Sequence, residues 1–523
     1  MENRNACTQN LLAEPFLLDR DLQWFSMPGR FSSGLYPATK GNFAMARPDN
    51  QFSGPELCAL SARKMVELLR RREVSVGEML KAAYARIDAV EPDVNALPIL
   101  CRERATSAAA SLSGNSDHPA WLAGLAITIK DSMPVNGVLA TSGSFGLKEF
   151  VPDTSDPLVE RLENRGAVVI AKSNMPEFGA GGNTFNKVFG ATRNPWDTRK
   201  NAGGSSGGAA VSLATGETWL AQGSDLAGSL RTPAAYCGVV GLRPSPGRAG
   251  GGSPAAAFNI DSVAGPMARD VSDLALFLDA MAGFDERQPI SLEEPALSFQ
   301  SAVERADANI RVAFSEDQGG FAPVEPEIRQ IMRDAMMKVE NAGGTVSVAC
   351  PDLPDQYETS VVLRGINYAV LEANIPKHIQ KHFKETLRQN IDFGLKLTPA
   401  QIFAAQRGRS LLYHRMREFL QDHDVFAIPV VGLEPGLVEE EFPTSIDGQS
   451  ITSYIDWLKF SFLATTCALP ALSLPIGFTK SGMPVGIQLI GPARGEAKLL
   501  RVARAIEEAM QFGASPINPV RRH

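Results

Sequence analysis

The chain has 523 residues, of which 44% are hydrophobic and 21% are charged, and its formal net charge is −7. This composition supplies enough apolar side chains for a large core and excludes general disorder. The 46 glycines and 35 prolines follow no period that would indicate a collagen-like repeat. The acidic balance and the absence of a long basic run give no support to a nucleic-acid partner.

The sequence also lacks membrane and secretion signals. The longest apolar run, residues 120–129, is shorter than the roughly 18 residues that a membrane helix needs. The first residues lack the basic and apolar regions of a secretory signal. The six cysteines are spaced widely and irregularly, which is typical of free thiols rather than a disulfide framework. We therefore expect a cytoplasmic protein without a membrane-spanning segment.

The N-terminal part of the sequence divides into an irregular segment and two helices. Residues 1–53 mix Phe, Pro, Gly and Ser without a sustained period, and we interpret them as an N-terminal extension. Ser61 precedes an amphipathic run, and Ser75 with Glu78 has the form of a capping box. Apolar positions then recur at helical spacing until Pro92, which is expected to end the second helix.

The remainder of the chain alternates between strand-like and helix-like patterns. Apolar, β-rich runs at 125–129 and 167–171 flank a helical segment at 158–164, which indicates a sheet with helices packed on it. Further patterns predict a helix over 328–339, strands at 425–428, 471–474 and 485–490, and a helix over 496–510. Since no repeat or long linker separates these elements, we expect a single large α/β domain over 54–515 and a C-terminal tail over 516–523.

The most informative stretch contains two clusters of glycine and serine, at 203–208 and 223–229. Glycine clusters let the backbone approach a ligand closely. Such clusters are compatible with a flexible loop or with rigid turns that carry a catalytic serine. The compact apolar segments at 209–214 and 238–242 favour the rigid turns, because they set the clusters between buried elements.

One candidate motif in these clusters is the nucleophile elbow. Ser205 and Ser206 each match its G-x-S-x-G pattern, which requires an apolar strand just before the serine and a histidine downstream. The preceding segment 193–200 is polar and contains proline, which argues against the elbow. The histidine requirement does not exclude it, because candidates stand at 378, 382, 414 and 423.

Two other motifs are less well supported. Residues 166–173 resemble a phosphate-binding loop, but Ala171 occupies the position where a glycine is needed before the lysine. His378 and His382 have helical i, i+4 spacing, but lysines that would repel a cation flank them. We therefore expect no metal site.

The two clusters belong to a longer pattern, GGSSGG followed by GSDLAGSLRTPAAYCGVVGLRPSPGR, which resembles the amidase signature family. The resemblance extends over residues 54–515, with further matching segments at 124–131, 172–178, 194–196 and 482–492. It implies an α/β fold with a central mixed β-sheet covered on both sides by helices. It also implies a hydrolase of linear amide C–N bonds that uses no cofactor and no metal.

The resemblance implies a Ser–cisSer–Lys triad. By position, Ser229 is the nucleophile, Ser205 is the bridging serine after a cis peptide bond from Gly204, and Lys130 is the base. A serine hydroxyl needs a neighbouring base, and a lysine serves as one only when it is neutral. Burial favours the neutral amine, and Lys130 follows an apolar β-rich run as that requirement demands.

The family also implies an oxyanion hole made of backbone N–H groups, here those of Leu226, Ala227, Gly228 and Ser229. Gly179 is expected to take part in oxyanion or substrate binding. The sequence departs from the common pattern at two positions, since Ala227 replaces a usual glycine and Arg243 a usual lysine. A changed pocket wall is expected, with strain at Ala227 if that position needs a positive φ. Asp225 and Arg231 are expected to hold the loop by hydrogen bonds.

The resemblance leaves two functions open. The first is a stand-alone amidase acting on a small carboxylic or aryl amide, with anilides, carbamates and esters as compatible substrates. The second is the glutaminase-type amidase subunit of a tRNA-dependent amidotransferase, which works in a complex and passes on ammonia. A catalytically silent binding protein is disfavoured because all three triad positions are filled. Family members form homo-oligomers, so a homodimer is compatible with the sequence but not indicated by it.

Substrate choice is expected to depend on residues 300–430, on 178–182 and on the N-terminal extension. Three aromatic residues of the first segment, Tyr368, Phe383 and Phe403, are as compatible with the core as with a pocket wall.

Overall fold

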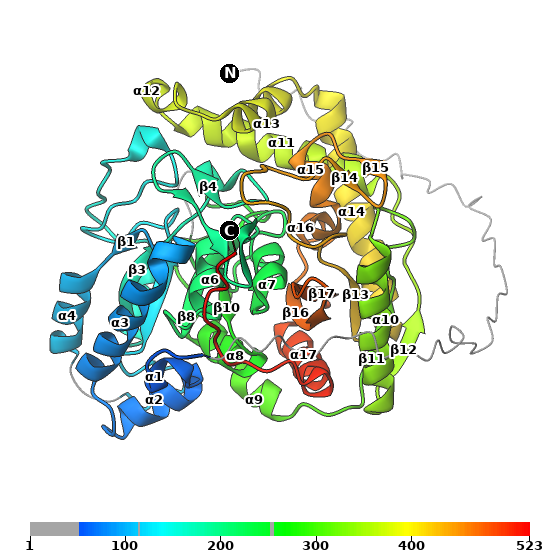
Figure 1. Cartoon of the computed structure of the whole chain (residues 1–523). Helices are drawn as coiled ribbons and strands as arrows, with labels where there is room; N and C mark the ends of the chain where they lie inside the picture. The colour runs from blue at the N-terminus through cyan, green and yellow to red at the C-terminus, as the bar shows by residue number, and fades with distance from the viewer. Residues whose placement is uncertain (1–51, 113–115, 252–255, 523) are drawn as a thin grey trace, which may run out of the picture. The chain divides into compact units, whose positions relative to one another are not determined.

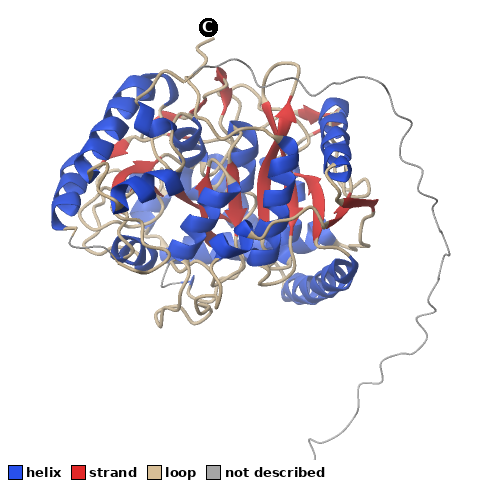
Figure 2. Ribbon diagram, turned by 90° about the horizontal axis from the view of Figure 1, so that it is seen from below, coloured by secondary structure: helices blue, strands red, loops and turns tan. Residues whose placement is uncertain are grey.

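The computed structural model describes residues 52–112, 116–251 and 256–522. These residues form an α/β unit around an eleven-stranded mixed sheet (Figure 1). Helices lie on both sides of the sheet, as Figure 2 shows. The predicted fold class, a single large α/β domain with a central mixed sheet, is confirmed for the described residues. The extension predicted for residues 1–53 lies outside the described residues up to residue 51.

The strands of the large sheet are, in chain order, β1 (Ile99–Leu100), β2 (Ala126–Lys130), β3 (Val168–Ser173), β8 (Leu220–Asp225), β9 (Val240–Arg243), β10 (Val263–Ala268), β11 (Arg311–Phe314), β12 (Thr345–Val348), β13 (Val425–Pro429), β16 (Ala471–Phe478) and β17 (Pro484–Ile490). Their order across the sheet is β1-β3-β2-β8-β10-β9-β16-β17-β13-β11-β12. β2 runs parallel to β3 and β8, and β11 runs parallel to β12 and β13, whereas the other pairs are antiparallel. Small two-stranded sheets are β4 (Phe185–Asn186) with β5 (Gly190–Ala191), β6 (Arg193–Asn194) with β7 (Asp197–Asn201), and β14 (Ser445–Ile446) with β15 (Gln449–Ser450).

The helices are α1 (Glu56–Ala59), α2 (Ala62–Arg70), α3 (Val76–Val94), α4 (Arg102–Ser111), α5 (Pro157–Asn164), α6 (Gly207–Ala214), α7 (Arg231–Cys237), α8 (Val271–Met281), α9 (Phe299–Glu304), α10 (Pro326–Asn341), α11 (Gln356–Asn374), α12 (Lys377–Gln380), α13 (Glu385–Leu395), α14 (Pro399–Asp422), α15 (Tyr454–Trp457), α16 (Phe462–Thr466) and α17 (Glu496–Met510). Short 3-10 helices are η1 (Phe145–Leu147), η2 (Glu177–Gly179) and η4 (Lys459–Ser461). The predicted helix over 496–510 agrees with α17. The strands predicted at 125–129 and 167–171 are present as β2 and β3, which each begin one residue later, and the other predicted elements of the sheet and its helices extend beyond their predicted bounds.

The two N-terminal caps form as predicted, but the end of α3 differs. Ser61 Oγ accepts the Lys64 N–H, and Ser75 with Glu78 forms a complete capping box. The prediction that Pro92 ends the helix was wrong by two residues, because a proline in the last turn removes only one hydrogen bond. The helix ends instead where Asn95 adopts the left-handed conformation, with φ of 50°.

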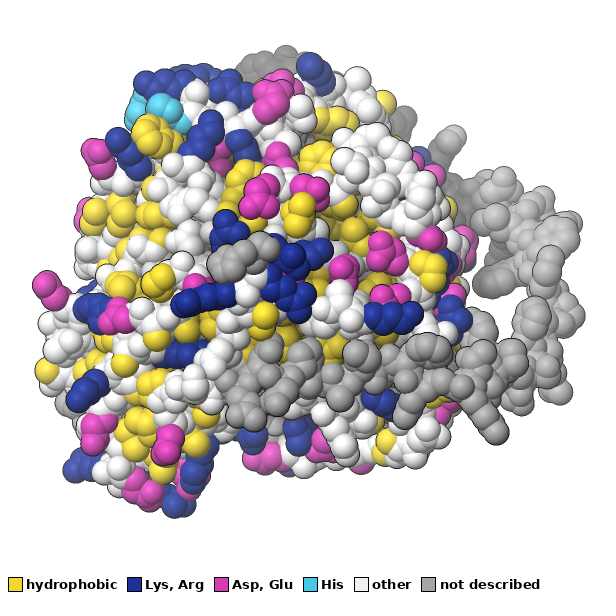
Figure 3. Space-filling view, in the orientation of Figure 1, with side chains coloured by type: hydrophobic (Ala, Val, Ile, Leu, Met, Phe, Trp, Pro, Cys, Tyr) yellow, Lys and Arg dark blue, Asp and Glu magenta, His cyan; other side chains and the backbone are white. Residues whose placement is uncertain are grey.

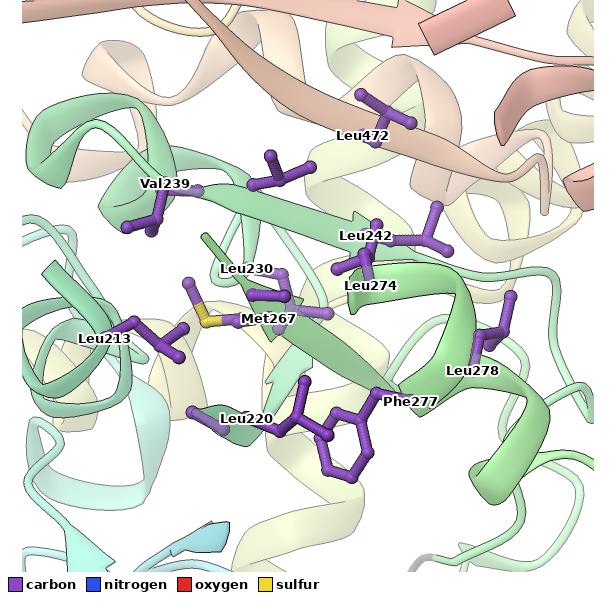
Figure 4. Packing of buried hydrophobic residues seen from close by; sticks show 14 of the residues in the cluster. Leu213, Leu220, Leu230, Val239, Leu242, Met267, Leu274, Phe277, Leu278 and Leu472 are labelled. Atoms are coloured by element: carbon purple, nitrogen blue, oxygen red, sulfur yellow. The ribbon is translucent and has the colours of Figure 1, made fainter. Parts of the chain in front are cut away.

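The core lies where the sheet meets α8. Figure 4 shows Leu220, Met267 and Leu242, from the neighbouring strands β8, β10 and β9, packed against Leu274 and Phe277 of α8. Each of these side chains is fully buried. Burial of one such side chain contributes about 1.5–3 kcal/mol, so this packing holds the middle of the sheet rigid.

The C-terminal segment and the surface complete the unit. Ile517 is buried, and its N–H donates to the Ala214 carbonyl oxygen at 2.8 Å.

Lys and Arg side chains gather near the middle of the face in Figure 3, with acidic side chains close by. In the C-terminal segment, Arg521 forms an ion pair with Asp93 at 2.8 Å. No helix among the described residues is long and apolar enough to cross a membrane. The five cysteines that the structure describes are free thiols.

Candidate active site

Lys130 lies at the end of β2 and is the centre of the candidate site. It is fully buried, and its Nζ lies within hydrogen-bond distance of three serine hydroxyls, those of Ser205 at 2.6 Å, Ser206 at 2.9 Å and Ser224 at 3.1 Å. The parallel pairing of β2 with β8 brings Ser224 close, and the turn before α6 supplies the other two serines. The backbone N–H of Lys130 donates to Gln222 Oε1 at 3.0 Å and fixes the strand end.

The surroundings of Lys130 favour its neutral form. Burial lowers the pKa of Lys130 from its ordinary 10.5 to about 7, and the negative charge of Asp225 opposes this shift. A large part of the Lys130 side chains is therefore neutral at physiological pH. A neutral amine has a lone pair that can accept a proton, so Lys130 can act as a base.

Ser205 follows a cis peptide bond from Gly204. This segment fits tightly against its neighbours, since a Cβ at Gly204 would lie 2.8 Å from the Gly181 carbonyl oxygen. The chain enters it from the small β6–β7 sheet and not from a central strand. The apolar strand that a nucleophile elbow needs before its serine is thus not there, as the polar sequence of 193–200 indicated.

Ser229 lies in the turn between β8 and α7, and its side chain is partly exposed. The Ser206 N–H donates to the Ser229 carbonyl oxygen at 3.1 Å, which ties the two glycine- and serine-rich turns together. Within the described ranges, the Ser229 hydroxyl has no hydrogen-bond partner. The structure thus joins Lys130 and Ser205 by a direct hydrogen bond and places Ser229 next to them through the backbone.

Asp225 holds the turn that carries Ser229. This buried carboxylate accepts the N–H groups of Gly228 at 3.0 Å and Leu230 at 3.1 Å. It also accepts two hydrogen bonds from the Arg231 guanidinium, at 3.0 and 2.8 Å. Burial alone would raise the pKa of Asp225, but the guanidinium groups of Arg231 and Arg243 outweigh it and hold the pKa at about 2. Asp225 is therefore ionised and clamps the turn.

The hydrogen bonds to Asp225 also determine which backbone N–H groups of the turn remain available to bind a ligand. The Gly228 N–H is committed to Asp225, whereas the N–H groups of Leu226, Ala227 and Ser229 donate to no acceptor among the described residues. Ala227 does not adopt a positive φ, whereas Gly228 does, with φ of 88°. The alanine at position 227 therefore causes no backbone strain, and the conformational need for glycine lies at position 228.

Three glycines of neighbouring strands, Gly223, Gly265 and Gly241, form a surface without side chains beneath the turn, here called the glycine floor. A Cβ at Gly223 or Gly265 would lie 2.7 or 2.6 Å from the Leu230 side chain, and one at Gly241 would overlap the Leu230 carbonyl oxygen. Because Leu230 follows Ser229 directly, the glycine floor sets how close Ser229 comes to the sheet.

Arg243, the second departure from the family pattern, is buried at the end of β9. Its Nη1 donates to the carbonyl oxygens of Asp225 at 2.6 Å and Asp261 at 2.7 Å. Asp261 in turn accepts a hydrogen bond from Asn367 of α11 at 2.7 Å and pairs with Arg409 of α14. Arg243 thus connects the base of the Ser229 turn to the helices that follow β12.

Gly179 lies beside Ser205, as a Cβ on it would be 3.4 Å from Ser205 Oγ. Its neighbour Phe178 packs edge-on against Phe383, with ring centroids 5.3 Å apart. Phe383 and Tyr368 are buried in one apolar cluster, whereas Phe403 is 66% exposed. The sequence left these three aromatic residues undecided between core and pocket wall, and the structure brings two of them next to the 178–180 loop.

No metal centre is visible in the part of the chain that the structure describes, since no group of three His, Cys, Asp or Glu side chains is arranged to hold an ion. Residues 168–173 form strand β3 instead of a phosphate loop. His382 packs against Phe145, with ring centroids 5.3 Å apart.

Sequence reasoning missed two serines that contact Lys130, Ser206 and Ser224. Ser206 was considered only as part of an elbow motif, and Ser224 was seen only as a member of the second cluster. The sequence predicts no strand before Ser224, so the pairing of β8 with β2 that brings Ser224 to Lys130 was not foreseen.

Comparisons with known proteins agree with this geometry. The family model described as Amidase matches residues 78–500. The chain belongs to the amidase family. An acylamidase from Rhodococcus erythropolis is 33% identical over 458 residues, which cover 86% of this chain and 95% of that protein. The A subunit of the glutamyl-tRNA(Gln) amidotransferase from Moorella thermoacetica is 34% identical over 490 residues, covering 87% of this chain and 98% of that protein.

Solved structures of the amidase family give the same result. The structure of a bacterial aryl acylamidase of the amidase signature family has a TM-score of 0.79 at 26% identity, covering 87% of this chain and 97% of that one. As a member of the amidase family, the protein is a hydrolase that acts on amide C–N bonds.

Proposed function

We propose that the protein is a stand-alone amidase that hydrolyses the C–N bond of a small carboxylic or aryl amide through an acyl-enzyme on Ser229. Anilides, carbamates and esters belong to the same range of substrates. The proposal is supported above all by one contact, the 2.6 Å hydrogen bond from the buried Lys130 Nζ to Ser205 Oγ. A lysine with a pKa of about 7 has no evident structural purpose there, whereas a relay to a serine nucleophile requires it.

In the proposed first step, Ser229 Oγ attacks the amide carbonyl carbon. The Ser229 proton moves to Ser205, whose own proton moves to the lone pair of neutral Lys130. The carbonyl oxygen becomes an oxyanion, and the N–H groups of Leu226, Ala227 and Ser229 are the donors proposed to stabilise it. One such donor is typically worth about 10²–10³ in rate. Gly228 is left out of this set because its N–H is bonded to Asp225.

In the second half of the reaction, the C–N bond breaks as the leaving nitrogen takes the proton back along the relay from Lys130 through Ser205. Water then attacks the Ser229 ester, gives its proton to the same relay and releases the carboxylic acid. Ser205 is placed to serve both steps because Lys130 contacts its hydroxyl directly.

A second candidate function is the amidase subunit of a tRNA-dependent amidotransferase, which works with partner subunits. The observation that favours it is the 34% identity to such a subunit from Moorella thermoacetica. The protein purified alone separates the two. A stand-alone amidase releases product from an anilide without a partner, whereas the amidotransferase role requires partner subunits that copurify with the chain.

The proposed nucleophile is tested by labelling the protein with a fluorophosphonate and mapping the adduct by peptide mass. We expect the adduct on Ser229, and its loss in Ser229→Ala and Lys130→Met. Ser212→Ala is the matched control, because Ser212 is a buried serine of α6 whose hydroxyl only bonds the Ala209 carbonyl oxygen. An adduct on Ser205 or Ser206 instead of Ser229 would contradict the assignment.

A further inference from the structure

Arg364 of α11 is a buried cation that lacks an acidic partner among the described residues. It is only 5% exposed. Its hydrogen bonds go to neutral groups, from Nε to Asn390 Oδ1 at 3.3 Å and from Nη2 to the hydroxyls of Tyr368, at 3.1 Å, and Tyr454. Arginines are almost never buried this deeply unless they are paired, because removing a charge from water is costly. Arg364 is therefore held by neutral partners alone, as Arg86 is, but unlike Arg86 it does not use all of its nitrogen atoms among the described residues.

The free end of this guanidinium is Nη1. Within the described ranges, Nη1 donates no hydrogen bond. It is also not fully enclosed by neighbouring atoms, so a ligand can reach it. Two N–H donors therefore remain available to a ligand. Tyr368 and Tyr454 both pack against the guanidinium, with ring centroids 4.6 and 5.4 Å from its carbon, so the free end is fixed before any ligand arrives.

The position of Arg364 connects it to the candidate active site. Tyr368 belongs to the apolar cluster that contains Ala180. Tyr454 belongs to the cluster that contains Trp457, whose ring would be 2.5 Å from a Cβ at Gly182. Residues 180 and 182 lie in the loop that follows Gly179 and passes directly beside Ser205. Arg364 thus contacts two tyrosines whose apolar clusters both reach the loop beside Ser205.

A second contact ties the same helix to the other side of the site. One turn before Arg364, Ser360 Oγ lies 2.7 Å from Thr466 Oγ1 of α16. The carbonyl oxygen of Ser461, just before α16, accepts a hydrogen bond from Arg231 Nη1 at 3.0 Å. The helix that carries Arg364 is therefore positioned against both the 178–182 loop and the elements that hold the Ser229 turn.

We infer that Arg364 binds a carboxylate of the substrate, so that the amide hydrolysed here carries an anionic group. This inference rests on the proposed function of the Ser229 site. A guanidinium matches a carboxylate with charge-assisted hydrogen bonds, which are stronger than neutral ones. The bound anion supplies the counter-charge that Arg364 lacks within the described part of the chain. Arg231 and Arg243 need no such ligand because they share Asp225.

The experiment uses glutarate as the probe, with 1,5-pentanediol as a neutral compound of the same chain length. Calorimetric titration of the full chain is expected to show glutarate binding that Arg364→Gln weakens at least about tenfold, the range for a lost charge-assisted hydrogen bond. Arg364→Lys keeps the charge and is expected to bind with intermediate affinity. Arg415→Gln is the matched control, since Arg415 is an exposed arginine that pairs with Asp352 at 3.6 Å.

A second readout places the anion relative to Ser229. Glutarate is expected to slow fluorophosphonate labelling of Ser229 in the wild type but not in Arg364→Gln, and pentanediol is expected to slow neither. Equal glutarate binding by wild type and Arg364→Gln, or no binding by either, would overturn the inference. Arg364-dependent binding without slower labelling would remove the anion from the substrate site. If Ser229 is not labelled at all, the proposed function fails, while the titration still decides whether Arg364 binds a carboxylate.

Discussion

Proton concentration is the perturbation that tests Lys130 most directly. Burial lowers its pKa from 10.5 to about 7, which corresponds to roughly 5 kcal/mol in favour of the neutral amine. At pH 8 about 0.9 of the molecules would then carry a neutral lysine, against about 0.003 for an unperturbed one, a gain of about 300-fold. Since neutral Lys130 activates Ser229 in the proposed mechanism, we expect the rate of fluorophosphonate labelling to rise about tenfold from pH 6 to pH 8 and then level off.

The assay is the second-order labelling rate of Ser229, measured from about pH 5.5 to about pH 9.5 at constant ionic strength, a window that brackets the lowered pKa. The reagent carries no titrating group in this range, so the midpoint reports the free protein. Ser212→Ala is expected to give the same profile. A rate that continues to rise about tenfold per pH unit above about pH 9 would mean an ordinary lysine and would refute the reasoning. A flat profile would show that a group other than Lys130 activates the serine.

Two further changes test the surroundings of the site, and a third tests a helix cap remote from it. Gly228→Ala places a side chain at φ of 88° and against Ser461, so we expect kcat/KM for an anilide to fall at least about tenfold. In the control variant Ala227→Gly, we expect kcat/KM to stay within about threefold of the wild-type value. Arg243→Met removes one positive charge that compensates the buried carboxylate of Asp225. The negative charge of Asp225 then acts more strongly on Lys130, so we expect the pKa of Lys130 to rise and the labelling midpoint to move above about pH 7. Arg243→Lys retains the positive charge and is expected to leave the midpoint unchanged. Ser75→Ala removes a helix cap and is expected to lower the free energy of unfolding by about 1 kcal/mol without changing kcat/KM.

Those parts of the structure that depend on local pattern could be predicted from the sequence. The helix over 496–510 has its full apolar periodicity in the sequence, and the order of motifs singled out Lys130, Ser205 and Ser229. The contacts between them depend on which strands become neighbours, so the role of Ser224 beside Lys130 was not foreseen. The hydrogen bond from Gly228 to Asp225 is likewise set by the shape of one turn, which residue type alone does not determine.

The substrate side of the site was the least predictable. Arg364 lies in α11 between Leu363 and Gly365, and one of the residues that cover it, Tyr454, comes 90 positions later in the chain. A charged residue in a helix is usually exposed, so nothing in the local pattern singles Arg364 out.

The glycine floor has a consequence for how this protein can change. A surface that consists of backbone has no side chain to enlarge or trim, so even the smallest substitution at Gly241 meets the Leu230 backbone. A substitution at one of these glycines therefore has no intermediate effect, since it either preserves the distance between the sheet and Leu230 or displaces the whole turn. Helices α11 to α14, by contrast, lie between β12 and β13 in the chain and can exchange side chains one at a time. Under the proposed function, new substrates would thus be acquired through these helices while the turn that carries Ser229 stays fixed.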